Sequence, residues 1–145
     1  MLVVHEWSLA SGIVKSIEDE CRRQSVSGVS SVELAVGELS QIEVRALRQA
    51  LEELRKGTVM GGCKIRILRE KTRFRCSECG HSWPFSKSKQ ELEPLEKGGD
   101  NAVHYLPSTV NAFIRCPRCG SPDFQIASGL ALSIRKVLFD RMATA

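Results

Sequence analysis

The sequence contains no long hydrophobic run. Its apolar opening, Met1 to Val4, stops at His5 and Glu6. A membrane span needs roughly 20 consecutive apolar residues, and a signal peptide needs an apolar core of about 7–15 residues. We therefore expect no transmembrane helix and no signal peptide, and we expect a cytoplasmic protein.

The motifs of several common enzyme classes are also missing. The chain has no P-loop, no glycine-rich nucleotide-binding motif, no Ser/His/Asp arrangement and no paired histidines at helical spacing. These absences predict that the protein is not an enzyme.

The length and composition indicate a small soluble protein. At 145 residues, with 42% apolar and 26% charged residues, the chain can bury one modest core plus a metal-stabilised module, but not two full-sized domains. The formal net charge of +4 could indicate a nucleic-acid partner. Four zinc-bound thiolates and the two charges of the ion would bring that +4 to +2, so the basic signal is mild.

Hydrophobic periodicity predicts the regular elements outside the cysteine-rich segment. Apolar residues spaced by three or four predict helices over about residues 6–24 and 44–54, the second ending before Gly57. Alternating apolar residues predict strands near residues 32–36, 63–67 and 130–134.

The order of these elements predicts an α+β fold. We expect two helices on a small three-stranded sheet, with a four-cysteine, zinc-ribbon-like module inserted before the last strand. The predicted domains are residues 1–71 together with 128–145, and residues 72–127. Residues 87–101 contain a proline and two glycines among charged residues, and we predict that this stretch is flexible.

Four cysteines form two matching pairs, Cys76/Cys79 and Cys116/Cys119, each with two intervening residues and a following glycine. This spacing places both thiolates on one tight turn, and two such turns complete a tetrahedral site. The 36 residues between the pairs exceed the roughly 15–20 of a minimal site, but loop-closure entropy rises only slowly with length. We predict one closed structural zinc site, with iron as the open alternative.

The two other cysteines and the histidine beside the first cysteine pair need no metal to explain them. Cys21 and Cys63 fall on apolar faces, which predicts buried thiols. His81 follows the first cysteine pair but is not needed as a ligand, so we interpret it as an exposed polar residue.

A second candidate metal site lies near the amino terminus. His5 and Glu6 begin the segment His-Glu-Trp-Ser-Leu-Ala at 5–10. An imidazole close to backbone nitrogens and an α-amine can form the square-planar nitrogen set that Ni(II) and Cu(II) prefer. One histidine near a terminus is a weak signal by itself, and a solvated histidine is the plain alternative.

Taken together, the motifs resemble those of the HypA hydrogenase maturation proteins, which are nickel metallochaperones. The resemblance covers essentially the whole chain. Its motifs are the segment at 5–10, Val-Gly-Glu-Leu at 36–39, Ala-Leu-Glu-Glu-Leu-Arg-Lys-Gly-Thr at 50–58 and the two cysteine pairs. The long stretch between the pairs, with Val-His-Tyr-Leu-Pro at 103–107, is similar to the archaeal-type branch.

The resemblance implies a nickel-binding domain of two helices and three strands, plus a zinc domain. It implies that nickel is held at the amino terminus by His5 and by backbone nitrogens around His5 and Glu6, with His104 as a further candidate ligand. It also implies a HypB-type GTPase partner and delivery of nickel to the large subunit of [NiFe]-hydrogenase. We expect no membrane and no nucleic-acid partner.

Two positions depart from the family pattern. Family members usually begin Met-His-Glu, whereas His5 is fifth here and Val4 stands where the methionine is expected. A GUG start codon is translated as valine when it is read internally, so we interpret position 4 as the true start of the protein. The second departure is Asn111, where the archaeal branch often has another histidine.

A nucleic-acid-binding zinc ribbon is the alternative function. Four basic residues alternate before the first cysteine pair, and three aromatic residues lie nearby. They are Arg69, Lys71, Arg73, Arg75, Phe74, Trp83 and Phe85. The structural alternative is a solvated strand face above the small core of the module.

Overall fold

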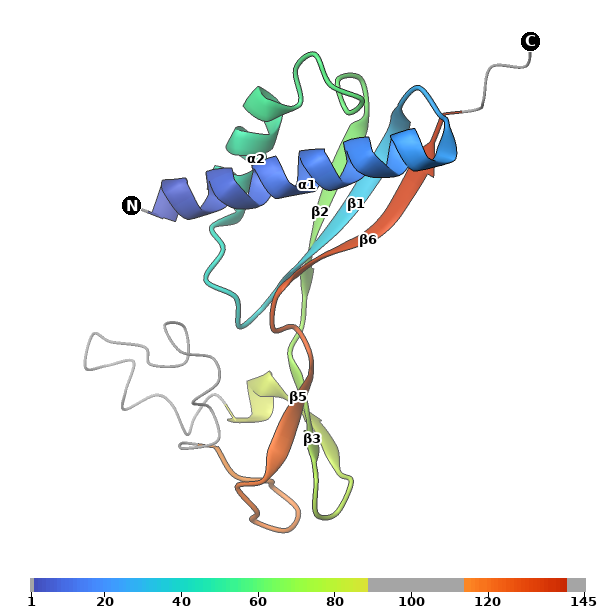
Figure 1. Ribbon diagram of the computed structural model, residues 1–145. Coiled ribbons are helices and arrows are strands. Elements are labelled where there is room, and N and C mark those ends of the chain that lie inside the picture. The colour runs from blue at the N-terminus through green and yellow to red at the C-terminus, as the bar shows by residue number, and fades with distance from the viewer. Residues whose placement is uncertain (1, 89–113, 141–145) are drawn as a thin grey trace. The chain divides into compact units, whose positions relative to one another are not determined.

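The protein is described by a computed structural model that places residues 2–88 and 114–140 (Figure 1). Two helices lie on one side of a sheet in the part of the chain that contains both helices. Helix α1 spans Leu2–Gln24 and α2 spans Val44–Leu54. The Glu43 carboxylate caps α2 by accepting a hydrogen bond from the Arg45 amide, which satisfies one of the unpaired N–H groups of the first turn. None of the described helices is long and apolar enough to cross a membrane.

The sheet beneath these helices has the strand order β2-β1-β6. Its strands are β1 (Val29–Gly37), β2 (Lys64–Glu70) and β6 (Leu132–Phe139). Strands β1 and β6 are antiparallel, although most of the chain separates them in sequence. The last strand therefore returns to the first sheet across an insertion, and the predicted α+β fold is confirmed.

The helices and this sheet enclose one apolar core. The apolar faces of α1, α2 and β1 supply most of it, and the helical stripes are those that the periodicity predicted. Its most buried members, each at most 3% exposed, are Ala10, Ile17, Cys21, Val32, Leu34, Val36, Leu47, Ala50, Leu51 and Met60.

A second sheet, with the order β4-β3-β5, contains the cysteine pairs. It is formed by β3 (Arg73–Cys76), β4 (Ser82–Pro84) and β5 (Phe124–Ser128), all antiparallel. Its separate core is largely aromatic. In that core Phe74 packs against three rings, those of Trp83, Phe85 and Phe124, with centroids 5.0–6.0 Å away.

The chain divides into two compact units. The helical unit comprises residues 1–36, 42–68 and 132–145, and the cysteine unit comprises residues 37–41 and 69–131. Residues 37–41 thus belong with the cysteine pairs although they connect β1 to α2. The assignment of nickel to the helical unit and of zinc to the cysteine unit is a prediction.

Candidate metal centre

Each cysteine pair is held on a tight turn with the same hydrogen bonds. In the first turn the Gly80 amide donates to the Cys76 carbonyl over 3.0 Å, and in the second the Gly120 amide donates to the Cys116 carbonyl over 2.8 Å. Both glycines have a φ of +76°, a left-handed conformation that side-chain-bearing residues rarely adopt. The Cys-x-x-Cys-Gly pattern therefore encodes the turn as well as the ligands.

The four sulfur atoms form a compact cluster in which every pair lies within 4.8 Å. The Sγ atoms of Cys76 and Cys119 are 3.5 Å apart, and those of Cys79 and Cys116 are 3.7 Å apart. A tetrahedral ion with metal–sulfur bonds of about 2.3 Å separates its ligands by about 3.8 Å. The described thiols thus fit a closed four-thiolate metal site, and sequence spacing alone had predicted all four.

Backbone amides around the cluster favour thiolates. Burial raises the pKa of the Cys116 thiol, but hydrogen bonds from the amides of Cys119 and Arg118 and with the thiols of Cys79 and Cys119 together outweigh it and lower this pKa to about 7. For Cys119 the Ser121 amide lowers the pKa, but the neighbouring cysteine sulfurs outweigh it and raise the pKa to about 12. A cation bound here would displace the proton that the raised pKa of Cys119 keeps on its thiol.

A hydrogen-bonded clasp joins three segments within the cysteine unit. The Glu38 amide donates to the Glu70 carbonyl over 2.8 Å, and the Leu39 amide donates to the Gly129 carbonyl over 3.0 Å. Buried Thr72 donates through its hydroxyl to the same Gly129 carbonyl, also over 3.0 Å. The Gly129 amide in turn donates to the Glu70 carboxylate over 2.7 Å.

The clasp requires glycine at position 129. Its φ is +78°, and a Cβ there would lie 2.5 Å from the Thr72 Oγ1. Sequence reasoning assigned no role to these residues. The Val-Gly-Glu-Leu motif at 36–39 is the one local signal that could have drawn attention to them.

The candidate nickel residues lie near the beginning of α1. His5 is exposed, whereas the Glu6 side chain is fully buried. Its Oε1 accepts a hydrogen bond from the Glu43 amide over 3.3 Å, and its Oε2 has no hydrogen-bond partner among the described residues. The structure therefore places the His5 imidazole in solvent and uses the Glu6 carboxylate inside the helical unit.

The other candidate residues have varied placements. Cys21 and Cys63 are buried, as predicted, and burial raises the pKa of both thiols. His81 is only partly exposed because its ring stacks on Trp83, with centroids 5.9 Å apart. The predicted flexible stretch 87–101 lies mostly outside the described residues, and His104 and Asn111 lie wholly outside them.

The aromatic residues of the nucleic-acid alternative are not available for base stacking. Phe74, Trp83 and Phe85 are each at most 5% exposed and form the core of the cysteine unit. The alternating basic residues before the first cysteine pair are exposed. Arg73 and Arg75 thus lie on the solvated face of β3, whose other face carries Phe74 into the small core, as the structural interpretation predicted.

Comparison with known proteins identifies the family. The family model described as "Hydrogenase/urease nickel incorporation, metallochaperone, hypA" matches residues 4–139. The chain belongs to the HypA family. This confirms the resemblance drawn from the motifs.

Archaeal relatives match nearly the full chain. A protein of Thermococcus onnurineus named hydrogenase maturation factor HypA is 32% identical over 95% of this chain and 97% of its own length. One of Pyrococcus furiosus with the same name is 33% identical over the same shares. Both relatives carry the name of a hydrogenase maturation factor.

Solved HypA structures share the fold. The Ni metallochaperone HypA from Helicobacter pylori gives a TM-score of 0.60 at 18% identity, covering 92% of this chain and 96% of that one. A second HypA solution structure gives 0.63 at 20% identity, covering 94% and 96%. Identities this low support the α+β fold alone.

Proposed function

We propose that the protein binds Ni(II) at its amino terminus and delivers it to the large subunit of [NiFe]-hydrogenase, with a HypB-type GTPase as partner. His5 would supply the imidazole, and backbone nitrogens around His5 and Glu6 would supply the remaining planar ligands. Family membership supports the nickel-chaperone role. The exposure of His5 near the start of α1 is the observation that carries the choice of site.

Glu6 has a positioning role in this proposal. Its carboxylate is buried and accepts the Glu43 amide, so it fixes the beginning of α1 beside the α2 cap while the His5 imidazole stays in solvent. Glu6 would therefore reach nickel through its backbone nitrogen, and not through its side chain.

We also propose that the four-cysteine site holds zinc with a structural role. Four thiolates leave no open position for water or substrate, which is typical of structural zinc. Iron accepts the same donor set, so metal analysis of the purified protein decides between them. One zinc per chain is expected, whereas stoichiometric iron would contradict this assignment.

The nickel proposal is tested by Ni(II) titration calorimetry of the parent, of His5→Ala and of His81→Ala as a matched control. High-affinity binding should vanish in His5→Ala and persist in His81→Ala, because His81 is stacked on Trp83 in the other unit. Unchanged affinity in His5→Ala would contradict the site.

His104 remains a proposed further nickel ligand. The His104→Ala variant should lose affinity or change its nickel absorption spectrum. An affinity and a spectrum equal to those of the parent would assign His104 no role in the site.

A further inference from the structure

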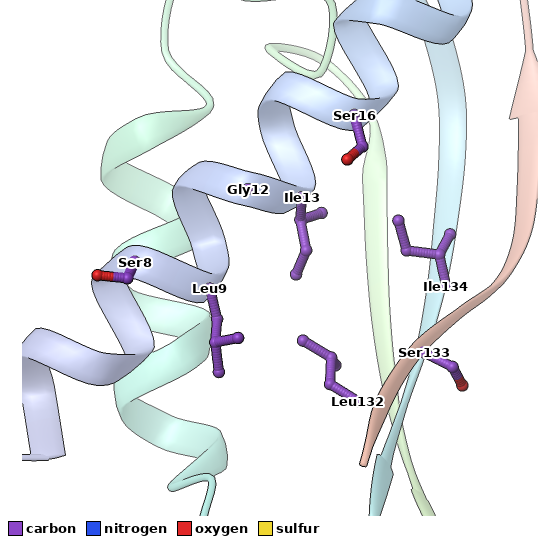
Figure 2. Close-up of a pocket in the computed structure, with 8 residues that line it drawn as sticks. All are labelled: Ser8, Leu9, Gly12, Ile13, Ser16, Leu132, Ser133 and Ile134. Atoms are coloured by element: carbon purple, nitrogen blue, oxygen red, sulfur yellow. The ribbon is translucent and has the colours of Figure 1, made fainter.

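A groove separates α1 from the strand β6 in the helical unit (Figure 2). Its volume is about 310 Å³, and Leu9 and Ile13 of α1 face Leu132 and Ile134 of β6 across it. The remaining lining residues are small: Ser8, Gly12, Ser16 and Ser133. A side chain at position 12 would enter open space, because nothing lies within 4 Å of the position that a Cβ would occupy there.

The strand below this groove is an edge strand. In the order β2-β1-β6 the outer side of β6 pairs with no other strand of the described chain. Ile134, which is paired in register with buried Leu34, is nevertheless 39% exposed. An open edge with apolar side chains in an adjoining groove is the arrangement to which an extended peptide adds as a further strand.

The charged residues around β6 indicate which kind of peptide would bind there. Arg135 is the extra residue of a β-bulge, and both Arg135 and Lys136 are exposed. On the sheet face opposite the helices, Lys136 lines a shallow hollow with Lys64 and Arg66, and Glu33 is the single acidic residue that lines it.

A second copy of β6 fits this edge poorly. Antiparallel self-pairing near the middle of β6 would bring the Arg135 and Lys136 side chains of two chains together, and like charges opposite one another destabilise a sheet. Lysines and bulges at edge strands disfavour such self-association.

We propose that the β6 edge and the α1–β6 groove bind an extended acidic segment of a partner protein by strand addition. Apolar side chains of the segment would enter the groove between Leu9 and Ile134, and the alternate acidic side chains would face Lys136. None of the residues that line this groove is a candidate metal ligand.

The test uses a short synthetic peptide that alternates valine with glutamate, and a matched peptide that alternates valine with lysine. Binding to the full chain is followed by amide NMR shifts and titration. The acidic peptide should shift the amides of residues 132–139 and bind more weakly as salt is added, because salt screens exposed charges. The lysine peptide should bind at least roughly tenfold more weakly.

Two variants locate the binding site. Gly12→Leu fills the groove in open space and favours the helix, so the protein should stay folded while its affinity for the acidic peptide falls by roughly tenfold or more. Ser11→Leu, at the neighbouring exposed helix position outside the groove, should bind like the parent.

The proposal is overturned if the acidic peptide leaves residues 132–139 unshifted, if both peptides bind equally, or if Gly12→Leu binds like the parent. A concentration-dependent dimer that Gly12→Leu abolishes would also overturn it, because a second copy would then be the occupant.

Discussion

Nickel affinity should depend on how much chain precedes His5. We compare the full chain, a form that begins at position 4 with methionine in place of Val4, and His5→Ala in both lengths. In the full chain α1 begins at Leu2, so the amides of His5 and Glu6 lie beyond the first three helical residues. In a regular α-helix such N–H groups already donate hydrogen bonds to the carbonyls four residues earlier.

The expected magnitude follows from those hydrogen bonds. Each one contributes about 0.5–1.5 kcal/mol, so releasing two amides for nickel costs about 1–3 kcal/mol, which corresponds to roughly 5–150-fold in affinity. In the shortened form these amides belong to the first turn and have no intrahelical partner to lose. Its α-amine also lies one residue from His5, which closes short chelate rings.

Titration calorimetry at one pH, together with far-UV circular dichroism, provides the test. The shortened form should bind Ni(II) more tightly, and nickel should reduce the helical signal only in the full chain. His5→Ala should abolish high-affinity binding at both lengths. Equal affinity of the two lengths would refute the roles assigned to the helix and the amine.

Three further predictions concern the cores and the metal site. Cys116→Ser should lose zinc and unfold the cysteine unit but not the helical unit, because structural zinc contributes about 10–16 kcal/mol of coupled folding energy; stoichiometric zinc with normal NMR dispersion would contradict this. Gly129→Ala should lower the free energy of unfolding of the cysteine unit by more than about 1 kcal/mol, the cost of a left-handed backbone alone, because its Cβ would also meet Thr72. Denaturant unfolding measures this loss. Cys21 and Cys63 should resist iodoacetamide at pH 8 until the protein unfolds, since burial raises both pKa values and keeps the thiols protonated, whereas rapid native labelling would contradict their burial.

The helical unit was predictable because its residues repeat with the period of their own elements. The apolar stripes of both helices and the alternation along β1 reappear as one core. The predicted last strand differs in its bounds: alternation suggested a start near Leu130, whereas β6 begins at Leu132 and continues to Phe139. Edge position explains the difference, because a strand exposed along one side keeps a weaker apolar pattern.

The cysteine ligands were predictable for a different reason. The spacing of each pair and its glycine is local, so the five residues from the first cysteine to the glycine determine a turn that occurs twice with nearly identical hydrogen bonds. The separation of the pairs carries no such information, since closing a longer loop costs little additional entropy. The sequence therefore predicted the site without predicting the strands β3, β4 and β5 individually.

The placement of residues 37–41 could not be predicted from local pattern. Leu39 is fully buried in the aromatic core of the cysteine unit, and the Glu38 carboxylate accepts the Thr72 amide over 3.1 Å. Both partnerships join residues more than thirty positions apart, and no helical or strand period relates them. Gly37 shows the same dependence, because a Cβ there would lie 2.3 Å from the Gly129 carbonyl oxygen. Close backbone contacts therefore hold this segment in the cysteine unit. In the sequence such contacts are visible only as glycines and short polar residues.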